Sequence, residues 1–385
     1  MIMQLENPKV KSAINRIIYS QNNSKNGVTL ICFASMHGNE PAGMFGMQKV
    51  MDSLKGKQSQ LNGNFYALLG NRSAFLNHVR FYEEDLNRLW TPDNLKAINN
   101  GQLKENEYKE QQELYNAIKK ITSYHTGDFV FIDLHTTSSP TIPFITISDS
   151  LNNRKLSRIF NIPIVLGIEE FLDGPLLSYI NEFGHPSIGF EAGQHDDEKS
   201  TWHCEAFVWL IMENLGLVDK SEFPYAEFKR LLNIEKGFYE IIYRYALEDA
   251  SDFEMNSGFQ NFTPITTQQL LAHHNFNAVK SPFNGLIFMP LYQKQGEDGF
   301  FIVRKVSTAW LVLSSVLRSL KFHQLLRLLP GIHKHPENDY ALIANKRIAR
   351  FLTTKIFHLF GYRKKIIIDD KVHYIKRDRK VSNFV

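Results

Sequence analysis

Residues 28–40, VTLICFASMHGNE, combine an apolar, β-branched run with a polar turn. A short run of this composition is typical of a buried strand, and the Ser-Met-His-Gly that follows it indicates a loop. Apolar side chains then recur at helical spacing up to residue 54, at Phe45, Met47, Val50, Met51 and Leu54. A strand, a loop and a helix in this order predict the first unit of an α/β fold.

Similar strand-like runs follow along the chain. They cover residues 64–69, 129–134, 142–147 and 187–190, and helical segments at 105–121 and 201–215 lie between them. This alternation predicts a mostly parallel, twisted sheet with helices on both faces. Polar residues stand directly after four of these strands: His37, Asn71, His135 and Glu191. Because such sheets bind their ligands at the carboxyl ends of the strands, we expect these four side chains to share one edge.

The second half of the chain has a different pattern. Residues 238–305 contain short strands and Gly/Asn/Pro turns, which predict a smaller β-rich domain. From about residue 306 the chain predicts helices over 310–329 and 340–360 and a final hairpin that turns at Asp369-Asp370. We therefore expect a catalytic domain over residues 1–220, a β-rich domain over 221–306 and a basic helical and hairpin extension over 307–385.

The composition, with 43% hydrophobic and 22% charged residues, is that of a globular protein. The sequence has no run of about 18 uncharged apolar residues that would predict a transmembrane helix. Its N-terminus lacks the apolar core of a secretory signal. The two cysteines, Cys32 and Cys204, lie among apolar neighbours, as free thiols of a reducing compartment do. These features predict a cytoplasmic protein.

Charge is distributed unevenly. Residues 310–385 hold 16 Lys+Arg against 5 Asp+Glu, so this tail carries +11 and the first 309 residues carry −7 of the net +4. Between residues 317 and 329 basic residues alternate with leucines. That pattern fits a basic amphipathic helix on a membrane surface, or leucines packed on this protein or on a second subunit, and we favour packing. No nucleic-acid-binding motif accompanies the charge, so no nucleic-acid partner is expected.

Candidate metal ligands follow the first and third strands. His37 and Glu40 are three residues apart, a spacing that lets both face one metal ion, and His135 ends the third strand. Two histidines and one glutamate, with a position left for water, are the ligand set of hydrolytic zinc, although cobalt and manganese also accept it. Asp133 lies on the same strand face as His135 and is expected to orient its imidazole.

Two further groups complete a hydrolytic site. Glu191 follows an apolar run, where desolvation raises the pKa of a carboxyl, and it is our candidate general base. The loop 71–88 presents Arg80, Asn87 and Arg88 within nine residues. Arginine holds carboxylates bidentately and stabilises an oxyanion that develops near a metal. Asp85 is expected to brace this loop.

These motifs together resemble the succinylglutamate desuccinylase/aspartoacylase family, which belongs to the wider zinc carboxypeptidase-like group. The resemblance rests on HGNEPAG, NRSA, DLNRLW, DLHTTSS and GFEAG, in this order between residues 28 and 200. It continues through GFQNFTPI, IFMPLYQKQG and DGFFIVRK to about residue 306. The tail lies beyond it.

The resemblance implies one Zn²⁺ per chain, bound by His37, Glu40 and His135, with Glu191 as the general base that activates water. It also implies positions for the substrate. Arg80 would polarise the scissile carbonyl, Asn87 and Arg88 would hold the carboxylate of the amino acid, and Tyr292 would reach the substrate from the β-rich domain.

One position departs from the family pattern. Ten residues before the catalytic glutamate, aspartoacylases of the animal type carry an arginine for the side-chain carboxylate of aspartate, and Asn181 stands there. Without that charge an acidic side chain loses its main partner, which argues against N-acetylaspartate. Lys294 is a candidate substitute. The cluster His195-Asp196-Asp197 is interpreted as a solvated turn.

The sequence therefore predicts a zinc amidohydrolase that removes an acetyl- or succinyl-type group from a small N-acyl amino acid. One alternative is a metallocarboxypeptidase that acts on a peptide or peptidoglycan fragment. A second is a non-catalytic binding protein that docks through its basic tail. A peripheral membrane contact of the tail and a homo-oligomer are both left open.

Overall fold

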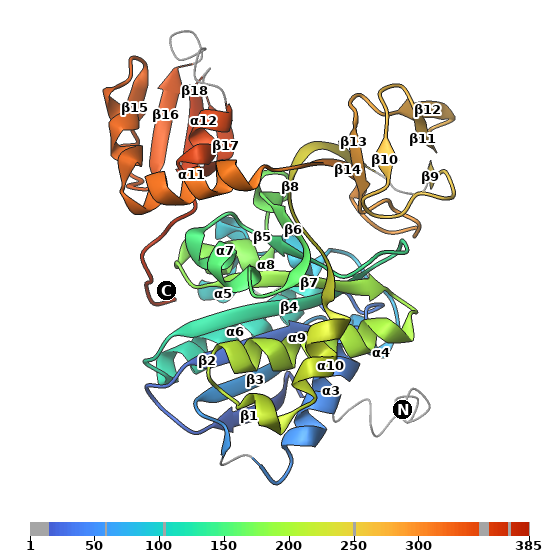
Figure 1. Ribbon diagram of the computed structural model, residues 1–385, viewed down its shortest axis with the longest axis vertical. Coiled ribbons are helices and arrows are strands. Elements are labelled where there is room, and N and C mark those ends of the chain that lie inside the picture. Colours follow the sequence, from blue (N-terminus) through green and yellow to red (C-terminus); the bar gives the residue numbers. More distant parts are fainter. Residues whose placement is uncertain are drawn as a thin grey trace.

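A computed structural model describes residues 15–57, 60–102, 105–248, 252–345, 354–368 and 371–384. An eleven-stranded mixed sheet in the order β1-β3-β2-β4-β7-β5-β6-β8-β14-β13-β10 runs through the molecule (Figure 1). Its strands are β1 Ile17–Asn22, β2 Thr29–Ala34, β3 Asn64–Leu69, β4 Phe129–Thr137, β5 Phe144–Ile147, β6 Asn161–Leu166, β7 Ser187–Gln194, β8 Asn233–Ala246, β10 Pro264–Ile265, β13 Gly285–Phe288 and β14 Asp298–Lys305. All five strand-like runs of the first half are strands.

The catalytic part of this sheet is mostly parallel, as predicted. β3, β2, β4 and β7 pair in parallel, and so do β5, β6 and β8. β1 pairs antiparallel with β3, and β5 pairs antiparallel with β7. Since β2, β4 and β7 run side by side in one direction, their carboxyl ends meet at one edge.

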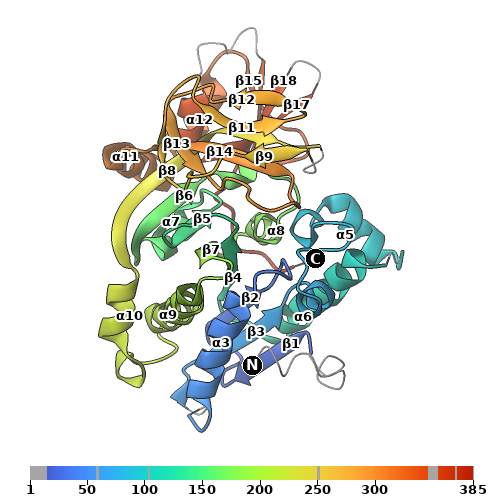
Figure 2. The same cartoon turned by 90° about the vertical axis from the view of Figure 1, so that its right-hand side faces the viewer.

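Helices cover both faces of the parallel strands (Figure 2). α3 and α9 pack on one face, over the side chains of Leu30, Cys32 and Ala34. α6 and α8 pack on the other face, over Ile31 and Phe33. The helices are α3 Ala42–Leu54, α4 Arg72–Leu76, α5 Pro92–Asn99, α6 Glu107–Tyr124, α7 Leu151–Ser157, α8 Leu176–Glu182, α9 Glu198–Asn214, α10 Tyr225–Leu231, α11 Thr308–Ser319 and α12 Thr354–Leu359, with 3-10 helices η2 Leu86–Arg88, η3 Ile168–Glu170, η4 Lys220–Glu222 and η5 Phe322–Leu328. None of the described helices is long and apolar enough to cross a membrane.

The β-rich region begins as an extension of the catalytic sheet. The first half of β8 pairs with β6, and its second half pairs with β14, which continues to β13 and β10. A separate three-stranded sheet, β12-β11-β9, lies beyond it and consists of β9 Phe253–Met255, β11 Leu270–His274 and β12 Asn277–Lys280. Because β8 belongs to both parts, the β-rich region is held firmly beside the sheet edge that carries the candidate site.

The tail is a small α/β unit and not the mainly helical extension that was predicted. Its sheet has the order β15-β16-β18-β17, with β15 Ile332–Lys334, β16 Ala341–Asn345, β17 Tyr362–Ile368 and β18 Lys371–Lys376. The hairpin of β17 and β18 is confirmed, while its turn at Asp369-Asp370 lies outside the described residues. The helix predicted over 340–360 is wrong at 341–345, where the apolar residues pair with β18. Only α12 within that range is helical among the described residues.

Buried ion pairs fix the tail to the catalytic domain. Asp149 is fully buried and accepts from Arg154 of α7 and Arg363 of β17, each at 2.8 Å, and Arg318 of α11 lies 3.4 Å away. These tail arginines are therefore not solvated charges. The Lys364 and Lys365 side chains lie outside the described residues.

The last described segment, 377–384, runs back along the catalytic domain, and we call it the C-terminal strap. Arg377 pairs with Glu182 at 3.1 Å, and the Ser382 amide donates to the Phe183 carbonyl at 2.9 Å. Phe384 stacks on His185 with 5.1 Å between ring centroids and packs into the core on the α6 face.

Candidate functional site

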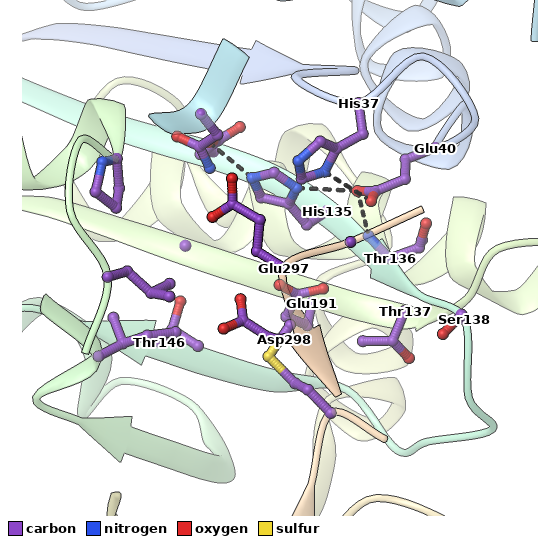
Figure 3. Close-up of a pocket in the computed structure, with 18 of the residues that line it drawn as sticks. His37, Glu40, His135, Thr136, Thr137, Ser138, Thr146, Glu191, Glu297 and Asp298 are labelled. Atoms are coloured by element: carbon purple, nitrogen blue, oxygen red, sulfur yellow. Dashed lines mark hydrogen bonds and ion pairs between the residues drawn. The ribbon is translucent and has the colours of Figure 1, made fainter. Parts of the chain in front are cut away.

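Three strand ends bring the predicted metal ligands and general base together (Figure 3). His37 and Glu40 lie on the turn between β2 and α3, where the Glu40 amide donates to the His37 carbonyl at 3.1 Å. Helix α3 begins at Ala42, after Glu40, so this turn and not the helix sets the spacing of the two side chains. His135 lies near the end of β4, and Glu191 is its direct register partner on β7. Side chains in register on parallel strands share a face, so Glu191 lies beside His135.

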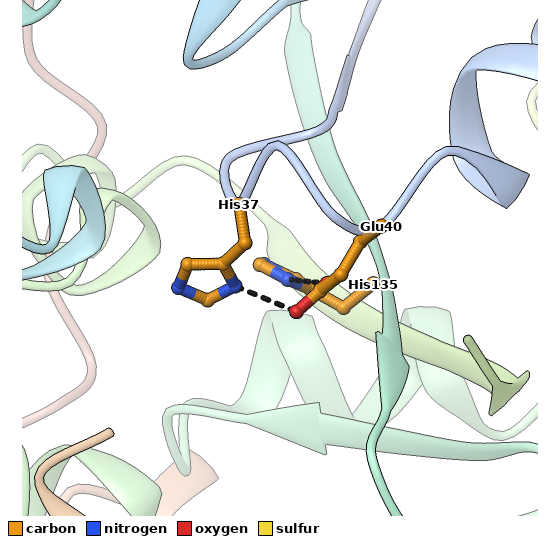
Figure 4. A group of neighbouring side chains, drawn as sticks. All are labelled: His37, Glu40 and His135. Carbon is orange, nitrogen blue, oxygen red and sulfur yellow. Dashed lines mark hydrogen bonds and ion pairs between the residues drawn. The ribbon is translucent and has the colours of Figure 1, made fainter. Parts of the chain in front are cut away.

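The two imidazoles are oriented as ligands of one metal ion (Figure 4). The Nδ1 atoms of His37 and His135 lie 2.8 and 2.9 Å from the two oxygens of Glu40. Each Nε2 faces a second carboxylate: Asp85 at 3.1 Å for His37, and Asp133 at 2.8 Å for His135. At His135 the Asp133 carboxylate fixes a proton on Nε2 and leaves the Nδ1 lone pair for a metal. At His37 the Nη2 atom of Arg80 also lies 3.0 Å from Nε2, beside Asp85. The positioning role predicted for Asp133 agrees with this contact.

Buried charge around these residues also fits a cation. Burial by itself would raise the pKa of Glu40, but His37 and His135 hold that pKa well below its usual range. Burial would likewise lower the pKa of His135, but the Asp133 and Glu40 carboxylates raise it well above its usual range. An imidazolium thus balances the carboxylates, and a divalent cation at the three ligands would take over that charge and release the proton. His37, Glu40 and His135 are the group of potential ligands whose atoms lie within 4.8 Å of one another in the described chain.

Glu191 is a buried carboxyl with unused hydrogen-bonding capacity. Burial raises its pKa to about 8, and although His135 lowers this pKa, the Glu40 carboxylate raises it further. Its Oε2 atom is inaccessible to solvent and has no hydrogen-bond partner. An unpaired buried oxygen is costly, and a carboxyl in this state beside a cluster of potential metal ligands is a candidate functional group.

A glycine joins the ligand turn to the arginine loop. The Gly38 amide donates to the Arg80 carbonyl at 3.0 Å, and a Cβ on Gly38 would meet the backbone of Ala74 at 2.1 Å. This close approach places the Arg80 guanidinium 3.2 Å from Glu40 Oε1. Arg80 therefore lies beside the candidate metal centre, as predicted.

Arg88 lies in the pocket but is already paired. Its Nη2 atom is 3.2 Å from Asp298 Oδ2, and its Nε atom is 3.5 Å from Glu297 Oε2. Both acidic residues line the same pocket as Glu191 (Figure 3). Asn87 also lines it, and its Oδ1 accepts from the Leu176 amide at 2.9 Å. The sequence resemblance implied that Asn87 and Arg88 bind the substrate carboxylate, but nothing in the sequence predicted Glu297 and Asp298 beside Arg88.

Tyr292 does not line this pocket. Its hydroxyl donates to the Asn256 carbonyl at 2.8 Å and accepts from the Phe259 amide at 3.1 Å, both within the β-rich region. The candidate substitute charge, Lys294, is exposed and is also absent from the lining. The Asn181 amide is buried and donates to the Leu177 carbonyl, so it has a structural role in this arrangement.

Besides Glu297 and Asp298, two further polar pocket residues were missed in the sequence. His195 was interpreted as part of a solvated turn, yet its Nδ1 lies 2.8 Å from Thr136 Oγ1 and its Nε2 lies 3.3 Å from Gln293 Oε1. Gln293 also accepts from Asn39 at 3.1 Å. It thereby connects the β-rich region to two loops of the catalytic domain. The signal for His195 was its place at the end of the strand that carries Glu191, and Gln293 gave no such signal.

Known proteins share this architecture. The sequence model described as the succinylglutamate desuccinylase/aspartoacylase catalytic domain matches residues 26–203. Among solved structures, the succinylglutamate desuccinylase of Vibrio cholerae is similar with a TM-score of 0.55 and 16% identity, over 73% of this chain and 82% of that one. The ectoine utilization protein of Ruegeria pomeroyi, solved with its product, is similar with a TM-score of 0.54 and 15% identity, over 73% of this chain and 87% of that one. No curated protein matches the sequence significantly. At these identities the structural matches show the fold.

Proposed function

Since residues 26–203 belong to the succinylglutamate desuccinylase/aspartoacylase catalytic-domain family, we propose that this protein is a zinc-dependent amidohydrolase that removes an acetyl- or succinyl-type group from an N-acyl amino acid. The observation that carries the proposal is the pair of imidazoles whose Nδ1 atoms converge on Glu40 while each Nε2 is held by a carboxylate. Metal-binding histidines usually donate their other ring N–H to a carboxylate, a backbone carbonyl or water, so this arrangement supports a catalytic metal at the three residues.

The chain's own residues supply the remaining chemistry. Zn²⁺ at His37, Glu40 and His135 would supply Lewis acidity toward water and the amide carbonyl. Glu191 accepts a proton from the attacking water as the new C–O bond forms. Arg80 stabilises the oxyanion of the tetrahedral intermediate. Glu191 then returns the proton to the amine nitrogen as the C–N bond breaks, which gives a carboxylate and a free amino acid.

Glu297 and Asp298, the two acidic residues beside Arg88, restrict the range of amino-acid side chains in the proposed substrate. In this proposal Arg88 and Asn87 would hold the α-carboxylate, and Glu297 and Asp298 already neutralise part of the charge of Arg88. A second carboxylate on the amino-acid side chain would meet these acids and would find no arginine at Asn181. We infer that the preferred amino acid has a neutral or basic side chain.

A panel of substrates on zinc-loaded protein tests the proposed function. N-acetyl and N-succinyl derivatives of acidic, neutral and basic amino acids are compared with short peptides that have a free C-terminus, and bound metal is measured in parallel. We expect about one zinc per chain and turnover of the N-acyl amino acids. Far less than one metal per chain, without response to added metal, contradicts the enzyme. Turnover of the peptides alone identifies a metallocarboxypeptidase.

Glu297→Gln is expected to shift side-chain preference. The Glu297 side chain is 51% exposed and lies on the pocket wall, so removal of its charge relieves repulsion of an acidic substrate by about 1 kcal/mol. The ratio of kcat/KM for basic over acidic substrates should fall about fivefold. Glu235→Gln is the matched control, because Glu235 is 65% exposed and pairs with Lys305 outside the pocket. An unchanged ratio would exclude Glu297 from specificity.

A further inference from the structure

A cluster of exposed apolar side chains occupies α11, η5 and the residues around them. Nineteen large hydrophobic side chains are exposed in the described part of the chain, and nine of them lie between residues 310 and 329. Single exposed apolar residues are ordinary on protein surfaces, whereas a contiguous cluster marks an interaction site. We call the exposed side chains of residues 310–329 the apolar face. The leucines between residues 317 and 329 were expected to pack on this protein or on a second subunit. Within this chain only Leu326 is buried and Leu317 is partly buried.

Helix α11 presents its apolar side to the solvent. Its buried residues, Leu311, Ser314 and Arg318, recur at helical spacing. Leu311 packs into the core of the catalytic domain, and the Ser314 hydroxyl donates to the Leu359 carbonyl of α12. Arg318 reaches the buried Asp149 of the catalytic domain. The exposed side of the same helix carries Val312, Leu313, Val316 and Leu320. A helix in a globular protein normally buries its apolar stripe, so this inverted arrangement leaves a surface without its partner.

The residues directly after α11 add further exposed apolar side chains. Lys321 has a left-handed backbone (φ 59°) and ends the helix, and η5 follows directly. Of η5, only Leu326 is buried, whereas Phe322, Leu325 and Leu328 are exposed, Leu328 by 79%. Figure 2 shows α11 at the periphery of the molecule, where an extended partner can reach it.

Charge identifies the kind of partner. Lys321 and Arg327 are exposed within the apolar face, and no Asp or Glu occurs between residues 299 and 336. A symmetric contact between two copies would gather the cations of both copies in one interface, and residues 299–336 offer no Asp or Glu to pair with them, which disfavours that contact. Tryptophan, phenylalanine and leucine interspersed with Lys and Arg are the composition that binds the surface of an anionic bilayer.

We propose that the apolar face docks this protein on the surface of a membrane that contains anionic lipids. The apolar side chains of α11 and η5 enter the boundary between headgroups and acyl chains, and Lys321 and Arg327 lie among the anionic headgroups. The buried pairs of Arg318 and Arg363 with Asp149 hold the face rigidly on the catalytic domain. Docking therefore brings the whole enzyme to the membrane.

Cosedimentation of the full-length protein with vesicles tests this proposal. Vesicles of phosphatidylcholine alone are compared with vesicles that also contain phosphatidylglycerol, at low and high salt. We expect binding to the anionic vesicles that weakens with salt. Leu325→Glu combined with Leu328→Glu should weaken it by about a hundredfold or more, because two inserted leucines are lost and two charges gained. Lys321→Gln should weaken it about fivefold.

Phe276→Glu is the matched control. Phe276 is fully exposed (101%) in the loop between β11 and β12, away from residues 310–329, and its replacement should leave vesicle binding unchanged. All variants change exposed side chains, so far-UV circular dichroism and the melting temperature should match those of the wild type. Absence of vesicle binding overturns the proposal. So does equal loss of binding in Phe276→Glu, or a stable dimer that Leu325→Glu with Leu328→Glu dissociates.

Discussion

Glu191→Gln is expected to lower kcat by about 10²–10⁴-fold while leaving the zinc content unchanged. Glutamine keeps the size of the side chain and loses only its ability to take a proton. Glu191 is the register partner of His135, and its Oε2 has no other hydrogen-bond partner, so the carboxyl has no structural task that glutamine would fail. The loss should appear in kcat far more than in KM, because proton transfer occurs in the transition state.

Glu169→Gln is the control for this variant. Glu169 is also fully buried, and burial likewise raises the pKa of its carboxyl, to about 7, but it does not line the pocket. Its replacement should leave kcat within about twofold of wild type. Comparable losses in both variants would show that removal of any buried glutamate disturbs the fold, and would remove Glu191 as the base.

The pH profile gives a second readout of the same group. A general base works only when ionised, so activity should fall as the pH drops below the pKa of Glu191. Burial raises that pKa from the ordinary 4.5 to about 8, and a divalent cation at the adjacent ligands lowers it. The acidic limb of kcat/KM is therefore expected between these two values. In Glu191→Gln the residual activity should lose this limb.

His135→Ala is expected to abolish stable zinc binding and to lower activity by more than about 10²-fold. Loss of a residue that only supports a metal ligand costs about 10–100-fold, and loss of the ligand itself should cost more. His135 supplies one of three ligands, and Asp133 would be left without the imidazole it orients. Added Zn²⁺ should raise the melting temperature of the wild type, because a ligand that binds the folded state stabilises it, and should not raise that of the variant.

His125→Ala is the matched control for the metal experiment. His125 is a buried histidine that contacts Tyr66 at 2.8 Å, and it does not line the pocket. This variant should lose stability but keep one zinc per chain and its zinc-dependent rise in melting temperature. Full zinc occupancy in His135→Ala would instead show that the metal binds elsewhere.

The local chemistry of the site could be predicted from the sequence because parallel strands place their carboxyl ends at one edge. That rule alone brings His37, His135 and Glu191 together once their strands are recognised. Asp133 was also predictable, since alternation along one strand decides its direction. Contacts between segments that are distant in the sequence could not be predicted in this way. Asp85 was expected to brace its own loop, and only the fold brings it to His37, 48 positions away.

Long-range contacts at the pocket wall and in the tail could not be predicted from the sequence either. Glu297 and Asp298 come from the β-rich region, and nothing in their local sequence predicts a contact with Arg88. Asp298 lies 210 positions after Arg88 in the chain. In the tail, residues 341–345 suit a helix or a strand equally by their apolar pattern, and pairing with β18 decides between the two. The exposed side of α11 contradicts the rule that helices bury their apolar stripe, and periodicity alone fits a buried and an exposed stripe equally.

The C-terminal strap has a consequence for the order of events during synthesis. Ser382 bonds to His185, 197 positions earlier, and Phe384 closes the core on the α6 face beside Phe131. Until the ribosome has made the strap, this flank of the catalytic domain stays open and its aromatic residues remain exposed. The strap therefore joins the catalytic domain last, because the strands and helices between His185 and Ser382 are made before it. A shortened chain that lacks residues 377–384 should expose these aromatic side chains and melt at a lower temperature than the full chain.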